Sequence, residues 1–433
     1  MLLGSSLALM VHGRSVEGRW LNFMGPLGLI LVALSVALYG PLTQVPGLYS
    51  LLPTAGALAL LVGGYAPNAP VTCLMSSAPM VWVGKISYPL YLVHWPIIIL
   101  MKEHIYEFTI AYRILGFAIS FAAASLVYYG FEQPVRHGKL LKNGRRYLLA
   151  TSGLSIGTVA ASAAVFVTDG LPTRFKPEVQ EYLEARSDTP VRFEGCERQF
   201  TSVDQLCLLG KSGSPPEVIV IGDSHAHALA GAFDLWLAEK GRTGALAFYS
   251  GCMPVLGAGR PDCERLIETS LIAVRDEPSV KDVILVSIWR QGLPSKGQPF
   301  LGRWVPADEV AQVFEEQLRK TVAMLVGAGK RVTIVDPLFS VSRSVPDTLA
   351  GNAAFHRNWP VEVPLAEHRT TFASITSAFD RLSGVKRVSL LGPLCDASVC
   401  RAIVNGQPLF TDNNHLAQAH SKLFASTIAG QID

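Results

Sequence analysis

Long apolar runs within residues 1–169 constrain the fold more than any other feature of the chain. A helix of about 20 apolar residues is needed to cross a bilayer core, and several of the runs reach that length. We therefore expect an α-helical transmembrane bundle of about five spans, preceded by a partial one at residues 1–11. The five runs occupy residues 23–40, 48–66, 79–101, 110–130 and 147–168.

Residues 176–433 hold most of the charge and alternate short strand-like runs with longer helical patterns. Continuous apolar strands that alternate with helices favour a parallel sheet covered on both faces. We expect a three-layer α/β domain over 215–433, with an amphipathic helix at 306–330 and a last helix from about Leu416. The expected strands are 217–222, 244–249, 282–289, 331–336 and 386–391.

These patterns divide the chain into four parts. The membrane domain covers residues 1–140, a linking transmembrane helix 141–169, a linker and extension region 170–214, and the α/β domain 215–433. The net charge of +3 is too small to indicate nucleic acid binding.

A basic loop at residues 135–147 predicts the orientation of the chain, because positive charge collects in cytoplasmic loops. Alternating outward from this loop leaves everything after Asp169 outside the cytoplasm. We expect a multi-pass protein of a bacterial inner membrane with its C-terminal domain in the periplasm. The basic residues that this argument places inside are Arg14, Arg19, Arg136, Lys139, Lys142, Arg145 and Arg146.

The cysteines indicate the same compartment. Six of the seven follow residue 169, where an oxidising environment would allow disulfides. The seventh, Cys73, falls in a loop that the charge argument places inside. Six cysteines allow 15 connectivities, and buried free thiols are the alternative. Pairing of sequence neighbours gives Cys196 with Cys207, Cys252 with Cys263, and Cys395 with Cys400.

The stretch "VIVIGDSHAHAL" (218–229) places a serine directly after a buried strand. Reactive groups of open α/β sheets collect at the carboxyl ends of strands. Ser224 would lie at the start of a helix, where backbone N–H groups favour a developing oxyanion. Gly222 would permit the tight turn, and Asp223 would order it. The same residues also occur at ordinary turns and helix caps.

A serine nucleophile needs a positioned base, and "LFTDNNHLA" (409–417) offers one. Asp412 precedes His415 by three residues, so its carboxylate can hold the imidazole in one tautomer while the other ring nitrogen faces Ser224. The end of the first strand and the start of the last helix are neighbours in this fold class. The sequence therefore predicts a catalytic triad of Ser224, His415 and Asp412.

Two family resemblances extend this interpretation. "LGSSLAL", "GKISYPLYLVHWP" and "YYGFEQPVRHGK" resemble the closing portion of the family-3 membrane acyltransferases, and "IGDSHA" with "DNNH" resembles the SGNH hydrolase family. "SGCMP" and "LCDASVC" are similar to SGNH domains fused behind such acyltransferases. The resemblance implies Ser224 as nucleophile, His415 as base and Asp412 as its orienter, with Gly251 at the position of the oxyanion glycine.

The membrane resemblance implies acetyl-CoA as acyl donor at the membrane half and an extracytoplasmic glycan as acceptor. Members of that family have about ten spans, with essential His and Arg residues in the early ones. This chain is expected to begin past them, so either it is a truncated gene product or a second polypeptide supplies the missing N-terminal spans. No bound cofactor is expected.

The loop after the third strand departs from the SGNH pattern. "SIWRQG" (287–292) stands where the family has G-x-N-D. Arg290 could donate to an oxyanion or pair with a carboxylate, and Trp289 could pack or stack on substrate. His225 and His227 suggest a metal, but no Cys or carboxylate nearby is free to complete a site. A helix-face or substrate-contact role is expected for both.

Three functions remain open. The first is an O-acyltransferase that acetylates a bacterial surface or cell-wall glycan, such as lipopolysaccharide, through an acyl-Ser224 enzyme. The second is an extracytoplasmic carbohydrate esterase, because the same triad hydrolyses when water replaces the sugar. The third is a non-catalytic, membrane-anchored remnant that binds glycan or a partner, favoured by the missing Asn block and opposed by the complete triad.

Overall fold

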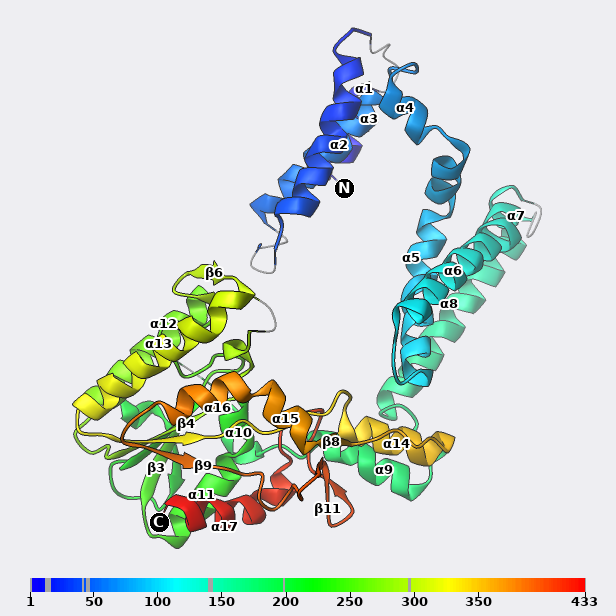
Figure 1. Ribbon diagram of the computed structural model, residues 1–433. Helices are drawn as coiled ribbons and strands as arrows, with labels where there is room; N and C mark the ends of the chain where they lie inside the picture. The colour runs from blue at the N-terminus through cyan, green and yellow to red at the C-terminus, as the bar shows by residue number, and fades with distance from the viewer. Residues whose placement is uncertain are drawn as a thin grey trace. The chain divides into compact units, whose positions relative to one another are not determined.

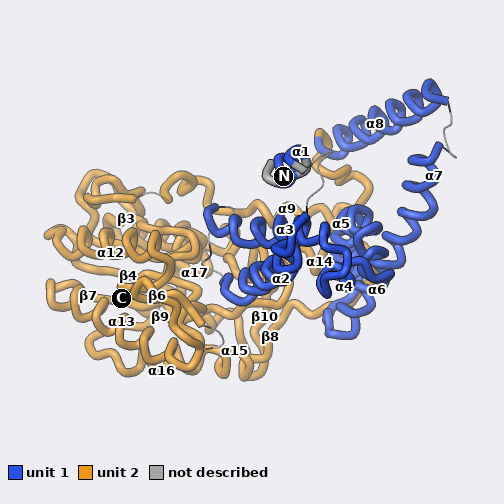
Figure 2. The backbone as a smooth tube through the Cα atoms, turned by 90° about the horizontal axis from the view of Figure 1, so that it is seen from above, with its two compact units in different colours: residues 1–166 blue, residues 167–433 orange. Residues whose placement is uncertain are grey.

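The computed structural model describes residues 2–11, 17–40, 43, 47–138, 143–197, 199–294 and 297–432. These residues form two compact units, Met1–Phe166 and Val167–Asp433 (Figure 2). Arg14, Lys139 and Lys142, on which the orientation argument draws, lie outside the described residues.

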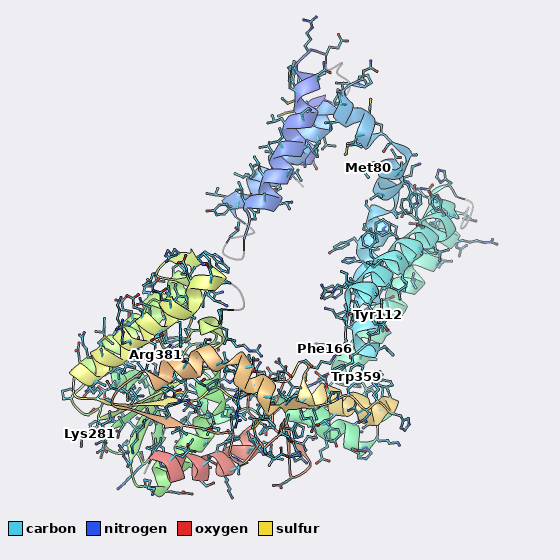
Figure 3. All side chains as sticks on the ribbon, in the orientation of Figure 1. Met80, Tyr112, Phe166, Lys281, Trp359 and Arg381 are labelled. Atoms are coloured by element: carbon cyan, nitrogen blue, oxygen red, sulfur yellow. A yellow bond between two sulfur atoms is a disulfide. The ribbon has the colours of Figure 1, made fainter. Side chains whose placement is uncertain are left out.

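The first unit is helical (Figure 1). Among its described residues, four helical stretches are long and apolar enough to cross a membrane, namely Leu21–Leu38, Ala78–His104, Ile110–Arg136 and Gly144–Val167. Many large apolar side chains on them are exposed, including Met80, Tyr112 and Phe166 (Figure 3). Such a surface suits lipid, so the helices indicate membrane anchoring. Its helices and helical turns are α1 (Leu2–Val11), α2 (Leu21–Leu38), η1 (Leu48–Ser50), α3 (Leu51–Gly63), α4 (Pro70–Met75), α5 (Ala78–His104), α6 (Ile110–Val127), η2 (Tyr128–Glu132), α7 (Gln133–Arg136) and α8 (Gly144–Val167).

The apolar run at 48–66 differs from the expectation of a full span. Its helix ends at Gly63, and Leu48–Gly63 is shorter than the four candidate spans. The Gly63 carbonyl accepts a hydrogen bond from Thr72 Oγ1 at 3.0 Å, which helps to end the helix. Small residues bring α3 close to α2, because a Cβ on Gly28 would meet the Gly56 carbonyl at 2.6 Å. Such small-residue contacts are typical of membrane helix pairs.

The second unit is built on a six-stranded sheet of order β1-β3-β2-β4-β7-β9. All neighbouring strands are parallel except β1, which is antiparallel to β3. This confirms the expected α/β domain with a mostly parallel sheet. The strands are β1 (Cys207–Gly210), β2 (Val218–Gly222), β3 (Thr243–Phe248), β4 (Asp282–Val286), β7 (Arg331–Val335) and β9 (Val385–Val388). All five expected strands are present, and β1 adds an edge strand that the sequence did not predict.

Helices cover both faces of this sheet (Figure 1). Successive side chains of a strand point to opposite faces. Accordingly, Val218 and Val220 pack with one core cluster, whereas Ile219 and Ile221 pack with the other. The first face is covered by α10 (Ser224–Ala228), α11 (Ala230–Glu239) and α17 (Ser421–Ile432), and the second by α12 (Pro261–Asp276), α13 (Ala307–Gly327) and α16 (Ala373–Asp380). The last helix begins at Ser421 rather than near Leu416, after the short turn η8 (Gln418–His420).

The order of strands puts a topological switch at β2. The chain passes from β2 to β3 on one side and then to β4 on the other. Register places Gly222 level with Phe248 and Val286 at the carboxyl ends of these strands. Ligand sites of open α/β sheets form at such a point.

The remaining elements lie outside the central sheet. The helix α9 packs against α14, and β8 pairs with β10. Their bounds are η3 (Pro172–Arg174), α9 (Pro177–Glu184), η4 (Ala185–Ser187), η5 (Val191–Phe193), η6 (Val203–Gln205), η7 (Arg290–Gly292), β5 (Gln298–Phe300), β6 (Arg303–Val305), α14 (Val345–Phe355), β8 (Glu362–Pro364), α15 (Leu365–Thr371), β10 (Val399–Arg401), β11 (Ile403–Val404) and β12 (Gln407–Pro408).

Candidate active site

The turn between β2 and α10 presents Ser224 at the carboxyl edge of the sheet. A side chain at Gly222 is excluded, because an added Cβ would lie 1.8 Å from the Val286 carbonyl oxygen. Ser224 is the first residue of α10, and the first N–H groups of a helix have no partner within it. The Ser224 N–H can therefore donate to a negative oxygen that develops beside its own hydroxyl.

Asp223, which precedes Ser224, holds two loops together. It is 2% exposed. Its Oδ1 accepts the backbone N–H of His225 at 2.8 Å, and its Oδ2 accepts Ser287 Oγ at 2.6 Å and the Ile288 N–H at 3.0 Å. A buried carboxylate with three donors fixes the turn and the loop after β4 against each other.

His415 lies in a tight loop that precedes the last helix. The Thr411 N–H donates to the His415 carbonyl at 2.8 Å, which closes the loop. Asp412 Oδ1 accepts the backbone N–H groups of Asn414 and His415, both at 2.8 Å. This contact folds the loop back on itself, so the Asp412 carboxylate lies beside the His415 ring.

Ser224, His415 and Asp412 form one hydrogen-bonded chain across 191 residues of sequence separation. Ser224 Oγ lies 2.7 Å from His415 Nε2, and His415 Nδ1 lies 2.7 Å from Asp412 Oδ2. Donation from Nδ1 to the carboxylate leaves Nε2 free to accept the hydroxyl proton of Ser224. The structure thus brings the three predicted residues together in the geometry of a nucleophile, a base and an orienting carboxylate.

The charges of the site suit this arrangement. The hydrogen bond to Asp412 raises the pKa of His415 above its ordinary value, against the effect of partial burial. Burial alone would raise the pKa of Asp412, but the hydrogen bonds from His415 and Asn414 outweigh it and lower that pKa. Asp412 is therefore ionised at neutral pH, and His415 is a stronger base than free imidazole.

The two histidines after Ser224 have separate places. The His225 ring stacks on His415, with centroids 4.7 Å apart, and burial lowers its pKa to about 4. The His227 ring stacks on Phe248 at 4.6 Å. Among the described residues, no group of three or more His, Cys, Asp or Glu side chains could hold a metal ion.

The loops after β3 and β4 contact each other through Gly251 and Gln291. Gly251 has a φ of +72° in the turn closed by the Cys252 N–H and the Tyr249 carbonyl, where glycine is favoured. Gln291 Nε2 donates to the Gly251 carbonyl at 2.7 Å. The sequence singled out Gly251 but not Gln291, whose position in "SIWRQG" beside the absent G-x-N-D block was the available signal.

Trp289 and Arg290 follow β4 with opposite environments. Trp289 is fully buried, donates from Nε1 to the Val335 carbonyl at 2.9 Å, and packs edge-on against aromatic rings, so it is a packing residue. Arg290 is exposed, and within the described part of the chain it forms no ion pair. Its charge contributes to the lowered pKa of His225, so it lies near the site.

The three disulfides are those of sequence neighbours. Cys196 bonds Cys207, Cys252 bonds Cys263, and Cys395 bonds Cys400. The remaining cysteine, Cys73, is an exposed free thiol. These three disulfides are the pairs that the sequence predicts.

The fold and this site define an α/β domain with a Ser-His-Asp constellation on a strand-to-helix turn. Residues 195–430 match the family described as "SGNH domain (fused to AT3 domains)", and the match covers more than half of the chain. The chain belongs to this family. The match does not extend to the membrane half, where the acyltransferase resemblance stays a prediction.

Other comparisons add little. The comparison with curated proteins found no match. Among solved structures, the chain is similar to the "Structure of Salmonella ser. Paratyphi A lipopolysaccharide acetyltransferase periplasmic domain". That similarity has 19% identity, covers 59% of this chain and 97% of that chain, and has a TM-score of 0.42.

Proposed function

We propose that the protein is an O-acyltransferase that acetylates a bacterial cell-surface or cell-wall glycan through an acyl-Ser224 enzyme. The hydrogen-bonded chain of Ser224, His415 and Asp412 carries this proposal, because it can activate a serine and later a sugar hydroxyl. Membership of a family of SGNH domains fused to AT3 domains, and candidate membrane spans in the same chain, support transfer across a membrane.

In the first step, Ser224 Oγ passes its proton to His415 Nε2 and attacks the acyl carbonyl. The donor leaves with that proton, and the acyl group stays on Ser224. In the second step, His415 takes the proton of a sugar hydroxyl, whose oxygen attacks the acyl carbon. Ser224 is released with that proton. Asp412 stabilises the imidazolium in both steps, and the Ser224 N–H faces the oxyanion.

The compartment and the partners belong to this proposal. Three disulfides in the second unit favour an oxidising space, so we place the domain in the periplasm and the helices in the inner membrane. Acetyl-CoA would be the donor on the cytoplasmic side, and a second polypeptide would supply further spans for acyl passage.

An acyl-enzyme experiment on the full chain in detergent tests the proposal. The protein is mixed with p-nitrophenyl acetate, and the release of p-nitrophenol (phenol release) and the intact mass of the protein are followed. We expect the mass of one acetyl group on the wild type and on Ser426→Ala, which alters an exposed serine on α17. Ser224→Ala should show neither phenol release nor the added acetyl mass. Faster discharge by saccharides than by water supports transfer, and discharge by water alone makes the protein an esterase. Equal phenol release and equal mass in the wild type and Ser224→Ala would contradict both enzyme functions and leave the non-catalytic, glycan-binding protein as the remaining function.

A further inference from the structure

The segment at residues 188–197 is fastened to the loops that carry the site. The Asp188 carbonyl accepts the backbone N–H of Gln418 at 2.9 Å, three residues beyond His415. At the other end of the segment, Glu197 Oε1 accepts the Ser250 N–H at 2.5 Å, next to Gly251. The segment therefore spans from the histidine loop to the turn after β3.

Two further links hold its middle and its end. Arg192 pairs with Asp234 on α11 at 2.5 Å. The disulfide between Cys196 and Cys207 joins the segment to the edge strand β1. A segment held by an ion pair, a disulfide and backbone hydrogen bonds is a fixed wall of the domain rather than a loose connection.

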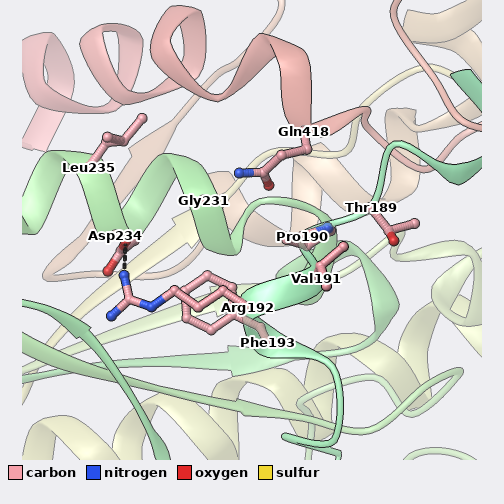
Figure 4. Close-up of a pocket in the computed structure, with 9 residues that line it drawn as sticks. All are labelled: Thr189, Pro190, Val191, Arg192, Phe193, Gly231, Asp234, Leu235 and Gln418. Atoms are coloured by element: carbon pink, nitrogen blue, oxygen red, sulfur yellow. Dashed lines mark hydrogen bonds and ion pairs between the residues drawn. The ribbon is translucent and has the colours of Figure 1, made fainter.

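A cavity of ≈ 360 Å³ lies between this segment, α11 and Gln418 (Figure 4). The charged side chains among its described lining residues are Arg192 and Asp234, which pair with each other. Asp234 Oδ1 also accepts the Gly210 N–H at 2.8 Å. The cavity is thus electrically balanced, which suits a neutral ligand better than an acidic one.

The uncharged polar side chains among the described lining residues are those of Thr189 and Gln418. Gln418 extends toward Gly231 (Figure 4), and its buried Oε1 has no hydrogen-bond partner among the described residues. The Gln418 amide and the Thr189 hydroxyl give this lining the hydrogen-bonding groups that ligand hydroxyls need. Pro190, Val191 and Leu235 add apolar surface to the same cavity. Hydroxyl donors on a partly apolar ring are the chemistry of a sugar.

The cavity lies close to the nucleophile. Gly231 follows Ser224 by seven residues, on α11, and Gln418 follows His415 by three. His227 lies on α10, the helix that begins with Ser224. The cavity is therefore lined by elements that continue along the chain from Ser224 and from His415.

We propose that this cavity is a subsite for a neutral sugar residue of the acceptor glycan, adjoining the residue whose hydroxyl attacks the acyl-Ser224 carbonyl. The proposal rests on the function proposed above and adds a substrate class to it. It predicts that the enzyme acylates neutral oligosaccharides better than the corresponding monosaccharides, because only the longer acceptors reach both the acyl-Ser224 carbonyl and the cavity.

The test compares acceptors on the full chain in detergent, with p-nitrophenyl acetate as donor. The acceptors are glucose, maltose and maltotriose, then N-acetylglucosamine and its β-1,4-linked dimer and trimer, and an acidic series from galacturonic acid to its trimer. We measure kcat/KM for each, normalised to phenol release by the same preparation. A hydrogen-bonded sugar subsite should give a trimer preference of about tenfold in a neutral series.

Variants connect this preference to the cavity. Val191→Trp, at a 66% exposed lining residue, should fill the cavity, and Gln418→Leu should remove the amide. Both should reduce the trimer preference to near one. The matched control is Ile272→Trp, which fills a separate cavity of ≈ 380 Å³ beside α12 and should keep the preference.

The outcomes separate the subsite from the underlying function. Equal kcat/KM for monomer and trimer in the wild type overturns the subsite, and so does a preference that survives Val191→Trp and Gln418→Leu. An equal gain in the acidic series overturns the neutral assignment. In these cases Ser224-dependent transfer still stands. Ser224-dependent phenol release without transfer to any saccharide contradicts the transferase itself, and the subsite with it.

Discussion

The imidazole of His225 lies against the imidazole of His415, with ring centroids 4.7 Å apart and planes inclined by 26°. His225 is 7% exposed, and burial lowers its pKa to about 4, so it is uncharged at neutral pH. An uncharged planar neighbour restricts the rotation of His415 without repelling the imidazolium that forms during the reaction. His225 therefore positions the base and does not need to touch the substrate.

This contact predicts different effects for two substitutions at His225. His225→Ala removes the stacked ring, so His415 loses its support, and kcat for phenol release should fall by about tenfold because misplaced catalytic groups are costly. His225→Phe keeps an aromatic ring there and should retain most of kcat, with KM little changed in either variant. Steady-state kinetics with p-nitrophenyl acetate measure this. Equal losses in both variants would show that stacking is not the reason for the contact.

The same burial predicts a loss of stability in acid. Between pH 6.5 and about 4 the unfolded chain protonates His225 while the folded chain does not, so the free energy of unfolding falls as the pH falls. Over that interval, protonation of His225 in the unfolded chain lowers the free energy of unfolding by an amount on the order of 3 kcal/mol. Urea unfolding of the second unit within the full chain can be monitored by pulse proteolysis. The free energy of unfolding should fall less at acid pH in His225→Phe than in the wild type. A parallel pH dependence in both proteins would contradict the assignment.

The pKa of His415 predicts the acid limb of the activity profile. A base must be deprotonated to act, and the hydrogen bond to Asp412 raises the pKa of His415 above the ordinary 6.5. Activity should therefore rise with pH through a midpoint above 6.5. Asp412→Asn removes the charge that favours the imidazolium, so the midpoint should move to lower pH while the plateau falls by roughly 10²- to 10⁴-fold.

The control for this profile is Asp308→Asn, an exposed carboxylate in the first turn of α13. It should leave both the midpoint and the plateau unchanged. Phenol release between pH 5 and 9 measures all three proteins. An unshifted midpoint in Asp412→Asn would show that another group controls the limb.

Close contact between β2 and β4 predicts that Gly222 tolerates no side chain. A Cβ at this position would lie 1.8 Å from the Val286 carbonyl oxygen, so Gly222→Ala should force the strands apart beside Ser224. We expect a loss of about 3 kcal/mol in the free energy of unfolding, together with loss of activity. Gly327→Ala, at the end of α13 with open space around it, should be neutral or stabilising by about 0.5 kcal/mol. Similar values for both would remove the steric argument.

Much of the second unit could be predicted from local sequence patterns. Each central strand is a short, continuous apolar run, and Gly-Asp-Ser after one of them marks the turn that Ser224 occupies. Asp412 and His415 are separated by three residues, so their contact is also local. The long-range contact between Ser224 and His415 followed from topology, because parallel strands end at one edge and the last helix returns there.

Other features depend on contacts that no short window contains. The edge strand β1 has four residues and pairs with β3 through tertiary contact. The role of Trp289 was undecided because packing and stacking use the same side chain, and burial settles it. The hydrogen bonds of Asp188 with Gln418 and Ala419 join residues about 230 apart. The end of α3 at Gly63 was missed because hydropathy counts the following residues as apolar, whereas consecutive glycines favour a turn.

The disulfides predict a graded loss of stability when they are removed one at a time. Chain entropy assigns about 3 kcal/mol to a closed loop of the size between Cys196 and Cys207, and about 2 kcal/mol to the shorter loop between Cys395 and Cys400. Replacing both members of each pair by serine should lower the free energy of unfolding of the second unit in that order. Cys73→Ser, at an exposed free thiol, is the control and should change nothing.

The Cys196 and Cys207 pair should also affect recognition, because it fixes the segment at residues 188–197 to β1. Without the disulfide, this segment keeps its ion pair and backbone hydrogen bonds but is ordered for a smaller fraction of the time. The trimer preference for neutral acceptors should therefore fall. Replacing Cys395 and Cys400 should leave that preference intact, since neither residue belongs to the segment. Pulse proteolysis and acceptor kinetics on the same preparations measure both effects. A loss of preference in the Cys395 and Cys400 variant equal to that in the first would show that the effect follows global stability instead of the segment.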